Sequence, residues 1–322
     1  MTLPLCVIAP LRKEPVEGDG LRLGKSRSDT RIFPVPRAEI LAPRGDSRNV
    51  VVQRGARRTV SPRDEIAAIN QRHWEKEVEA GCGFTIPWLD LDRDVLKQFV
   101  EGRLDPVPER LLSEFPPHVF AGAEGKDVLC LASGGGQQSA IFGVLGARVT
   151  VVDLTEGQLA GDRKAAEHYG YEVRTIQADM RDLSCLDAES FDLVYQGPSM
   201  GYIPDVCEVY REVAGVLRKG GLYRADGENP AVQFVDWDGE GYRITRPYAE
   251  RMVRRGEDGQ GAFDFRHYLS DAFNGLLAAG FGIEEVHESP VHFQQDPEAV
   301  PGSWKHVQMH VPNSFAIVAR IS

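Results

Sequence analysis

An apolar run that passes straight into a glycine-rich turn constrains this chain more than any other feature. Val128 to Leu131 form a strand pattern, Gly134-Gly135-Gly136 follow, and Ser139 to Leu145 have the composition of a helix start. Glycines allow the backbone of such a turn to approach a ligand closely, and the N–H groups at a helix N-terminus attract an anion. A second strand ends in Asp153, about 20 residues further on, where a nucleotide-binding α/β fold places its acceptor for the ribose hydroxyls. The pattern therefore predicts a cofactor cradle.

Strands and helices alternate from about residue 126 onward. Five strands are predicted first, at Asp127–Leu131, Val149–Asp153, Glu172–Gln177, Phe191–Tyr195 and Gly221–Ala225. The helices predicted between them are Gln138–Leu145, Glu156–His168 and Val206–Leu217. Residues 226–263 interrupt the alternation. A further helix and two last strands are predicted at Tyr268–Ala279, Ile283–Glu288 and Ser314–Ile321. Strands separated by helices of this length predict a parallel sheet with right-handed crossovers.

The region before residue 119 has a different character. Residues 1–60 show no sustained hydrophobic period and carry 12 Lys and Arg against 6 Asp and Glu, which predicts an irregular basic extension. Ser61 and Pro62 then mark a helix start, and a second short helix follows at residues 92–102. We therefore expect three parts: this extension, a helical cap over residues 61–118 that covers the substrate, and a cofactor-binding domain over residues 119–322. The last part includes a lid inserted at residues 226–263.

The charge balance argues against a nucleic-acid partner. The formal net charge is −11, and residues 61–322 carry 25 Lys and Arg against 42 Asp and Glu. Because nucleic-acid affinity comes largely from neutralised phosphates, an acidic body is a poor docking surface for it. No apolar run approaches the roughly 18 residues needed to span a bilayer, so no membrane partner is expected either.

The cysteine and histidine patterns bear on metals and on the compartment. The five cysteines are scattered and include no C-x-x-C pair, which favours a reducing cytoplasm over a disulfide framework or a zinc site. Four histidines gather near the C-terminus, at His287, His292, His306 and His310. No carboxylate–histidine helix motif accompanies them, so we expect no metal site.

Two kinds of cofactor use such a glycine loop, namely dinucleotides and S-adenosylmethionine. The loop fits the dinucleotide fingerprint G-x-G-x-x-G poorly, because Ser139 stands where the third glycine belongs. The third predicted strand is followed by Asp179 and Met180, an acid and an apolar residue suited to an adenine amino group and ring. Three further motifs follow in order: F-D-L-V at residues 191–194, V-L-R-K-G-G at 216–221 and G-F-G-I at 280–283.

In the order and spacing of these motifs, residues from about 125 to the C-terminus resemble the class I S-adenosylmethionine-dependent methyltransferases. The resemblance implies a doubly wound α/β fold with a seven-stranded Rossmann-like sheet whose last strand is antiparallel. It implies that Asp153 binds the ribose hydroxyls, and that Asp179 and Met180 bind the adenine. The cofactor-binding residues that it implies are Ala132, Ser133, Gly134, Gly136, Gln138, Asp153, Leu154, Gln158, Asp179, Met180 and Gln196.

The chain departs from the family's usual D-x-G-x-G-x-G motif at two positions. Cys130 occupies the acidic position, and Ala132 occupies that of the first glycine. We expect Ala132 to be tolerated with a negative φ, where a Cβ costs little. We expect the side-chain amides of Gln137 and Gln138 to replace the polar anchor that the missing acid would supply.

Ligands of open α/β sheets lie beyond the carboxyl ends of the strands. Residues 64–102, the loop 196–205 and the lid can cover that edge. The candidates for contact with the methyl acceptor are Trp74, Trp88, Tyr202, Glu228, Asn229 and Asp264. The candidates for a part in catalysis are Tyr195, Gln196 and His73, the last as a general base that titrates near neutrality.

The acids of the lid favour a positively charged or zwitterionic acceptor. The sequence therefore predicts methyl transfer from S-adenosylmethionine to an O, N or S atom of a small polar metabolite, such as an amino acid or an amine. The loop after the fourth strand, Gln196-Gly197-Pro198-Ser199, lacks the N-P-P-(Y/F) motif common in methyltransferases of DNA bases and amide nitrogens.

Three alternatives stay open at this point. An NAD(P)-dependent oxidoreductase would bind a nicotinamide cofactor, and a regulatory module would bind S-adenosylmethionine without turnover. A nucleic-acid or protein methyltransferase would use residues 1–60 as a basic arm. The length of that extension also suggests docking on a neighbouring subunit, which is a hypothesis of a homo-oligomer from length alone.

Overall fold

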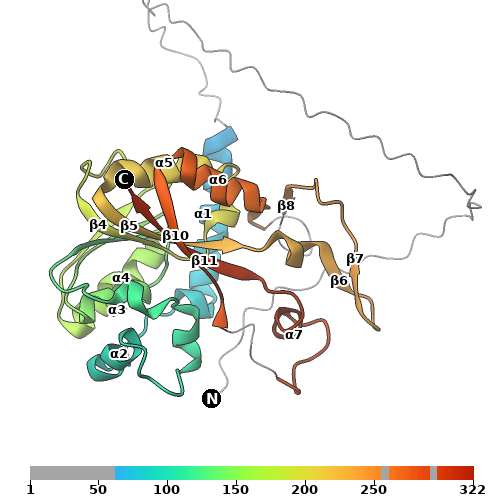
Figure 1. Ribbon diagram of the computed structural model, residues 1–322, viewed down its shortest axis with the longest axis horizontal. Coiled ribbons are helices and arrows are strands. Elements are labelled where there is room, and N and C mark those ends of the chain that lie inside the picture. The colour runs from blue at the N-terminus through green and yellow to red at the C-terminus, as the bar shows by residue number, and fades with distance from the viewer. Residues whose placement is uncertain (1–61, 255–260, 291–295) are drawn as a thin grey trace, which may run out of the picture. The chain divides into compact units, whose positions relative to one another are not determined.

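The computed structural model of the protein describes residues 62–254, 261–290 and 296–322. The predicted extension at residues 1–60 and His292 lie outside these residues. A seven-stranded sheet forms the centre, in the order β10-β11-β5-β4-β1-β2-β3 (Figure 1). Its strands are β1 (Asp127–Leu131), β2 (Arg148–Asp153), β3 (Val173–Gln177), β4 (Phe191–Gln196), β5 (Leu217–Glu228), β10 (Phe281–Glu288) and β11 (Ser314–Ile321). The first five are parallel, and β11 lies antiparallel between β5 and β10. The predicted sheet is therefore confirmed.

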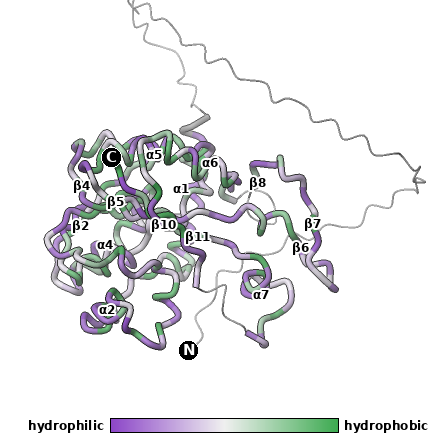
Figure 2. Tube along the Cα trace, in the orientation of Figure 1, coloured by the Kyte–Doolittle hydropathy of each residue, from purple (hydrophilic) through white to green (hydrophobic). Residues whose placement is uncertain are grey.

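Alternate residues of each strand enter two different hydrophobic cores, because side chains of a strand point to opposite faces. Leu129 and Leu131 pack on the side of α5 (Val206–Val216) and α6 (Leu269–Ala278). Val128 and Cys130 pack on the other side, with α2 (Arg93–Val100), α3 (Gln138–Val144) and α4 (Glu156–Tyr169). Burial on both faces explains why the central strands β1 and β4 are largely apolar in the sequence. The hydrophobic colouring in Figure 2 gathers accordingly along the sheet and the helices beside it.

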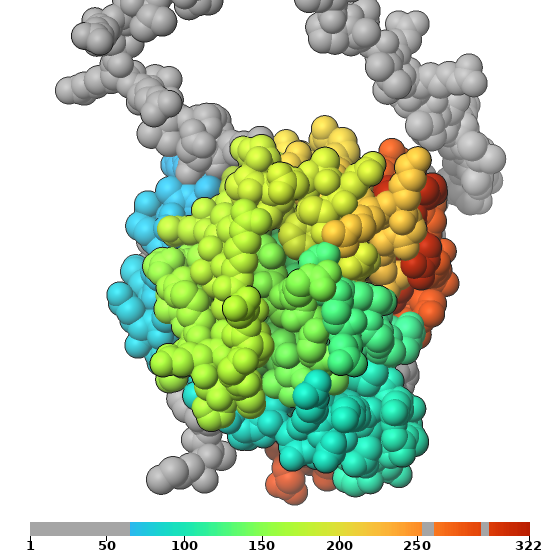
Figure 3. Space-filling view, turned by 90° about the vertical axis from the view of Figure 1, so that its left-hand side faces the viewer, coloured from blue at the N-terminus to red at the C-terminus, as the bar shows by residue number. Residues whose placement is uncertain are grey.

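The segment predicted as a helical cap is divided between two places. It contains α1 (Pro62–Glu79), α2 and the 3-10 turns η1 (Gly83–Thr85), η2 (Glu109–Ser113) and η3 (Pro117–Phe120). Leu96, Phe99 and Phe120 belong to the same core as β1 and β2. This later half of the segment therefore packs on the sheet itself, whereas α1, blue in Figure 3, lies beside α4 and also contacts β9.

The lid consists of short elements that follow β5. They are η5 (Pro230–Phe234), β6 (Val235–Trp237), β7 (Tyr242–Ile244), β8 (Met252–Arg254) and β9 (Phe263–Phe265). β6 pairs with β7, and β8 pairs with β9, each antiparallel. Two more short elements, η4 (Met200–Tyr202) and α7 (Trp304–Gln308), follow β4 and precede β11. Strands of three residues are too short to show a period, so the sequence did not predict them.

The described residues also bear on cysteines, metals and membranes. Cys130, Cys185 and Cys207 are free thiols, but Cys82 is disulfide-bonded, so the expectation of no disulfide is wrong at Cys82. Within the described ranges no three His, Cys, Asp or Glu side chains gather as metal ligands would. His306 and His310 instead pack on each other, with ring centroids 4.7 Å apart. No helix of this part of the chain has the length and apolar character that a membrane span requires.

Candidate active site

The glycine loop between β1 and α3 has an unusual backbone. Gly134, Gly135 and Gly136 have φ angles of +57°, +74° and +84°, which L side chains rarely adopt. Ala132 also has a positive φ, +45°, so the expectation of a negative φ is wrong. The left-handed conformation costs a non-glycine residue about 1–2 kcal/mol. The packing around the loop therefore holds Ala132 in a conformation that it would not choose alone.

The glycines allow other parts of the chain to pack directly on the loop. A Cβ at Gly136 would lie 2.5 Å from the carbonyl oxygen of Gly161 in α4. A Cβ at Gly135 would lie 3.0 Å from the backbone of Thr85 and 2.9 Å from Oε1 of Gln158. The loop is thus enclosed by α4 on one side and by the turn at Thr85 on the other.

The amide of Gln137 helps to fix that turn. Its Nε2 donates to the carbonyls of Gly83 and Ile86, at 2.9 and 3.1 Å, and Trp88 donates its backbone N–H to Gly136. Gln137 is therefore engaged in holding residues 83–88 on the loop, rather than in replacing the missing acid of the motif.

Asp162 in α4 ties the loop to the helix beside it. The hydroxyl of Ser139 donates to Oδ1 of Asp162 at 2.5 Å, and the backbone N–H of Gly136 also donates to this carboxyl. Desolvation by burial raises the pKa of Asp162 to about 7, although the bond from Ser139 lowers it. Ser139, which occupies the place of the third glycine in the dinucleotide fingerprint, therefore has a role in fastening the loop.

Asp153 and Gln158 lie where the chain leaves β2 and enters α4. Oδ1 of Asp153 accepts hydrogen bonds from the N–H and the hydroxyl of Thr155, and burial raises the pKa of Asp153. Gln158 is 4% exposed, and its Oε1 has no hydrogen-bond partner among the described residues. Leu154 accepts a hydrogen bond at its carbonyl from Gln177. This edge thus offers a carboxylate and an amide oxygen beside the loop.

Asp179, Met180 and Gln196 lie at the ends of β3 and β4. Arg181 binds Asp179 through its guanidinium, with Nε 2.9 Å from Oδ1 and Nη2 2.5 Å from Oδ2. Gln196 is fully buried and donates from Nε2 to Ser199 at 2.8 Å and to Sδ of Met180 at 3.4 Å. Its Oε1 accepts from the hydroxyl of Tyr223. Both ends of the Gln196 amide are therefore committed to neighbours within the protein.

Tyr195 faces the opposite side of the sheet from Gln196. Its hydroxyl donates to Oε2 of Glu114 at 2.6 Å, and Nε2 of Gln138 donates to Oε1 of the same carboxyl at 2.8 Å. The guanidinium of Arg224 lies 4.5 Å from the centre of the Tyr195 ring and binds Asp226 at 2.6 Å. Tyr195 and the Gln138 amide thus belong to a buried polar network, and the structure does not bring Tyr195 to the edge where a ligand would bind.

Two acids, one at the end of β5 and one in β9, converge on η4. A Cβ at Gly201 would lie 2.9 Å from Oδ1 of Asp264 in β9 and 3.0 Å from Oε1 of Glu228 at the end of β5. Gln233 donates to Oε2 of Glu228 at 2.7 Å and accepts from Nε of Arg266 at 2.8 Å. Glu228, Gln233, Asp264 and Arg266 thus form one charged cluster around Gly201 of η4.

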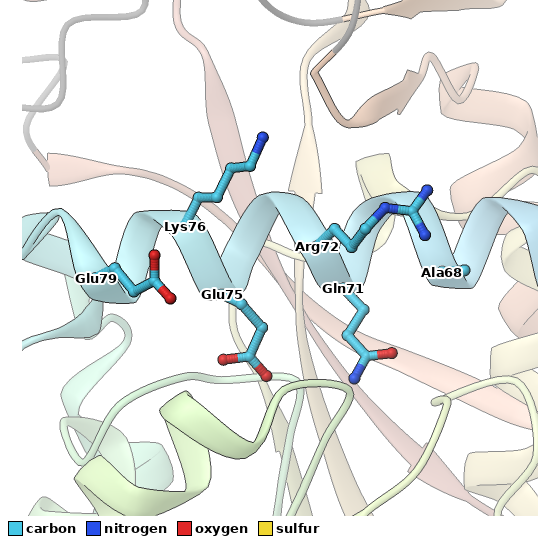
Figure 4. A pocket seen from close by; sticks show the side chains of 6 residues that line it. All are labelled: Ala68, Gln71, Arg72, Glu75, Lys76 and Glu79. Carbon is cyan, nitrogen blue, oxygen red and sulfur yellow. The ribbon is translucent and has the colours of Figure 1, made fainter.

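Trp74 of α1 borders the same cluster. Its ring lies 5.5 Å from that of Tyr202, in an edge-to-face arrangement. His73, its neighbour in α1, has Nε2 4.0 Å from Glu77. On the same helix, Figure 4 shows Glu75 and Gln71 projecting from one side, Lys76 from the other side and Arg72 along the helix, beside a surface hollow.

Trp88 contacts residues outside the charged cluster, whereas Asn229 directly follows Glu228 of that cluster. Trp88 packs beside the guanidinium of Arg110, 5.6 Å from its ring centre, and its carbonyl accepts a hydrogen bond from Tyr169. Asn229 caps η5 by accepting from the backbone N–H of Ala231. These contacts place both residues in the framework of the protein.

Three further residues hold this region, and the sequence did not single them out. Asn70 bonds Tyr202, 132 residues away, whereas Gln233 bonds Glu228, 5 residues away, and Arg266 bonds Gln233, 33 residues away. Arg266 is 2% exposed and packs over the ring of Phe234 at 5.0 Å. A polar residue in a helix or loop gives no sequence signal of which residue its side chain will bond, so only the fold could reveal these contacts.

Comparison with known proteins agrees with this architecture. The model of a methyltransferase domain family matches residues 129–225. The uncharacterized methyltransferase YbaJ of Bacillus subtilis (strain 168) is 31% identical over 242 residues, which are 72% of this chain and 93% of that protein. The chain belongs to the class I S-adenosylmethionine-dependent methyltransferases, and its cofactor is S-adenosylmethionine. This membership sets aside the oxidoreductase alternative.

Two further similarities are more limited. A ubiquinone biosynthesis O-methyltransferase of Xanthomonas axonopodis pv. citri (strain 306) is 30% identical over 158 residues, 49% of this chain and 56% of that enzyme. The chain thus matches little more than half of that relative's length. The crystal structure of an S-adenosylmethionine-dependent methyltransferase from Mesorhizobium loti aligns with a TM-score of 0.53 at 23% identity, over 72% of this chain and 100% of that one. This structural likeness supports the fold.

The residues of the loop fit a bound cofactor. One buried polar atom against it, Oε1 of Gln158, has no hydrogen-bond partner in the described part of the chain. Buried polar atoms are seldom left without a partner. Such an atom beside a glycine loop therefore indicates that a bound cofactor supplies the missing hydrogen bond.

Proposed function

We propose that this methyltransferase acts on a small polar metabolite whose charge is positive or zwitterionic, such as an amino acid or an amine. The observation that carries the proposal is the convergence of Asp264 and Glu228 on Gly201. Two carboxylates in a partly enclosed position favour a cation, because their fields add and less water screens them. Arg266, joined to Glu228 through Gln233, would suit the carboxylate of a zwitterion.

The cofactor would occupy the opposite half of the same edge. We assign its ribose hydroxyls to Asp153 and Gln158, and its adenine to Asp179 and Met180. S-adenosylmethionine, when bound, supplies an electrophilic methyl group on a sulfonium sulfur. The protein's contribution would be to hold the acceptor's lone pair in line with that carbon and to exclude water, which together account for much of the acceleration in such a transfer.

Individual side chains would have distinct tasks in this arrangement. Gln196 would hold Met180 and Ser199 in place, because both ends of its amide are engaged. Trp74 and Tyr202 would wall the acceptor site. His73, one residue from Trp74, is our candidate to accept a proton from the acceptor. The accepting atom is O, N or S, and the ubiquinone O-methyltransferase relative favours oxygen.

A methyl-uptake screen tests this function. The purified protein is incubated with labelled S-adenosylmethionine and matched sets of amines, amino acids, phenols and simple carboxylic acids. We expect turnover with cationic or zwitterionic compounds, and an increase in acceptor KM of about tenfold in Asp264→Asn and in Glu228→Gln, with S-adenosylhomocysteine affinity retained. The Asp153→Ala variant, measured in the same way, should instead show a lower affinity for S-adenosylhomocysteine. Turnover confined to uncharged acceptors, or unchanged KM in both lid variants, would reject the proposed acceptor class.

A further inference from the structure

Asn70 of α1 joins three segments that are far apart in the sequence. Its Nδ2 donates to the carbonyl of Tyr202 in η4 at 2.8 Å, and its Oδ1 accepts from the backbone N–H of Phe263 in β9 at 2.9 Å. The residue is 2% exposed. A buried amide that donates and accepts at once satisfies two backbone groups that would otherwise be costly to leave unpaired.

The two backbone groups that Asn70 binds lie next to the charged cluster. Tyr202 follows Gly201, and Phe263 precedes Asp264. The amide of Asn70 therefore fixes the backbone beside Gly201 and beside Asp264, two of the residues that meet in the charged cluster. One helical turn further on, Trp74 packs against the ring of Tyr202. The same face of α1 thus holds both the backbone and the side chain of η4.

The other end of α1 is attached to the cofactor half. Oε1 of Glu75 accepts from the backbone N–H of Glu156, the first residue of α4, at 3.1 Å. A Cβ at Gly157 would lie 2.8 Å from Oε2 of Glu75 and 2.9 Å from Val78. The Coulomb field of Glu75 also contributes to the raised pKa of Asp153, after the larger effect of burial. Neighbouring residues of α1 therefore contact the two halves: Asn70 and Trp74 contact the acceptor half, and Glu75 contacts the cofactor half.

We propose that Asn70 is a positioning residue for methyl transfer: it holds η4 and β9 together under α1, and so sets the spacing of Asp264 and Glu228 around the acceptor. The inference rests on the proposed acceptor site. Both amide atoms of Asn70 are bonded to backbone groups of the protein, so we assign it no direct contact with the acceptor or the cofactor. Its effect is transmitted through two backbone groups, so it should alter acceptor binding and leave the cofactor cradle unchanged.

The chemistry of the amide explains why the position needs Asn. Aspartate would keep the acceptor for Phe263 N–H, but would place a carboxylate oxygen against the carbonyl of Tyr202. Alanine would remove both bonds. A serine hydroxyl can donate and accept at once, but its single oxygen on a shorter side chain cannot stand in both places that Nδ2 and Oδ1 occupy, so serine should keep only part of the pair of bonds.

The test compares Asn70→Ala and Asn70→Ser with Arg72→Ala, an exposed change on the same helix. Amide hydrogen exchange is measured over residues 196–205, 261–266 and 128–145, together with S-adenosylhomocysteine affinity and acceptor kinetics. We expect Asn70→Ala to raise exchange at Phe263 and in η4 by about tenfold or more, with residues 128–145 unchanged. S-adenosylhomocysteine affinity should stay within about twofold, acceptor KM should rise about tenfold, and kcat should fall less than KM rises. Asn70→Ser should give a smaller change, and Arg72→Ala none.

Two outcomes would overturn the inference. One is an equal rise in exchange throughout the described sheet, which would make Asn70 a general stability residue. The other is local loosening of η4 and β9 with acceptor KM unchanged. If Asn70→Ala does not fold, Asn70→Ser carries both readouts. The proposed function fails separately, when Asp264→Asn and Glu228→Gln leave acceptor KM unchanged while the exchange pattern of the Asn70 variants is as expected.

Discussion

The two halves of the active-site edge are built in different ways. In the cofactor half, each group follows directly from the end of its own strand: the glycine loop from β1, Asp153 from β2 and Asp179 from β3. In the acceptor half, Asn70, Gly201, Glu228 and Asp264 come from four segments and meet only through tertiary contacts. The first half depends on backbone conformation, whereas the second depends on contacts between side chains. The same type of substitution should therefore have different consequences in each.

The largest effect is expected from Gly136→Ala in the cofactor half. The added Cβ would meet the carbonyl of Gly161, and the backbone would have to hold a φ of +84°. Because the obstacle is backbone, neither side can move aside cheaply. We expect a loss of roughly 3–5 kcal/mol in the free energy of unfolding, measured by urea denaturation. Gly215→Ala in α5, where a Cβ meets nothing within 4 Å, is the matched control and should raise stability by about 0.5–1 kcal/mol.

A pH-dependent effect is expected from Asp162→Asn. The folded-state pKa of Asp162 is raised from 3.8 to about 7, so the folded protein binds the proton more tightly than the unfolded chain does. Wild-type stability should therefore fall relative to the variant as the pH rises through this range, by about 3 kcal/mol between pH 4.5 and 7.5. Denaturation curves over this range measure the difference.

Asp127→Asn supplies the control for that measurement. Hydrogen bonds from Arg148 and Arg218 lower the pKa of Asp127 to about 2, with the bond from Arg148 the larger cause. Its stabilisation is fully present above the unfolded pKa and is lost only as the pH falls toward 2. The difference between wild type and Asp127→Asn should thus be nearly constant between pH 4.5 and 7.5. If the stability difference between wild type and Asp162→Asn is also constant over this pH range, the carboxyl of Asp162 is ionised in the folded protein.

The smallest effect on stability is expected from Gly201→Ala in the acceptor half. Its Cβ would meet the ends of the Asp264 and Glu228 side chains, which can rotate away. We expect a change of less than about 1 kcal/mol in unfolding free energy. Acceptor KM should nevertheless change several-fold, with S-adenosylhomocysteine affinity unaffected. A loss of stability as large as that of Gly136→Ala would remove the distinction between the two halves.

The sequence predicted the frame of the molecule with good accuracy. β1 and β11 begin and end where the pattern placed them, and the other five sheet strands differ mainly at their ends. β1, β2 and β4 are largely apolar and the others carry apolar residues among polar ones, and glycine, acid or turn signals bound them, so local chemistry suffices to locate them. The positions of Asp153 and Asp179 after β2 and β3 follow from the same local signals.

The structure places some of the residues that the sequence predicted at the active site in other parts of the fold. Tyr195 and Gln196 are adjacent, yet alternation along β4 sends them to opposite faces of the sheet. Trp88 looked suitable for an acceptor wall because it is aromatic, but it packs near Tyr169 behind the glycine loop. Ala132 has a positive φ because of the loop around it, which no property of alanine indicates.

The sequence by itself therefore determined the fold family, the cofactor and the strand ends that face it, because these depend on patterns within a few residues of one another. The tertiary structure alone decided that Asn70 spans to Tyr202 and Phe263 and that Glu228 meets Asp264. Such contacts join residues up to 193 positions apart. Their energy comes from hydrogen bonds and charges that exist only after the chain has closed these loops, so no local pattern in the sequence encodes them.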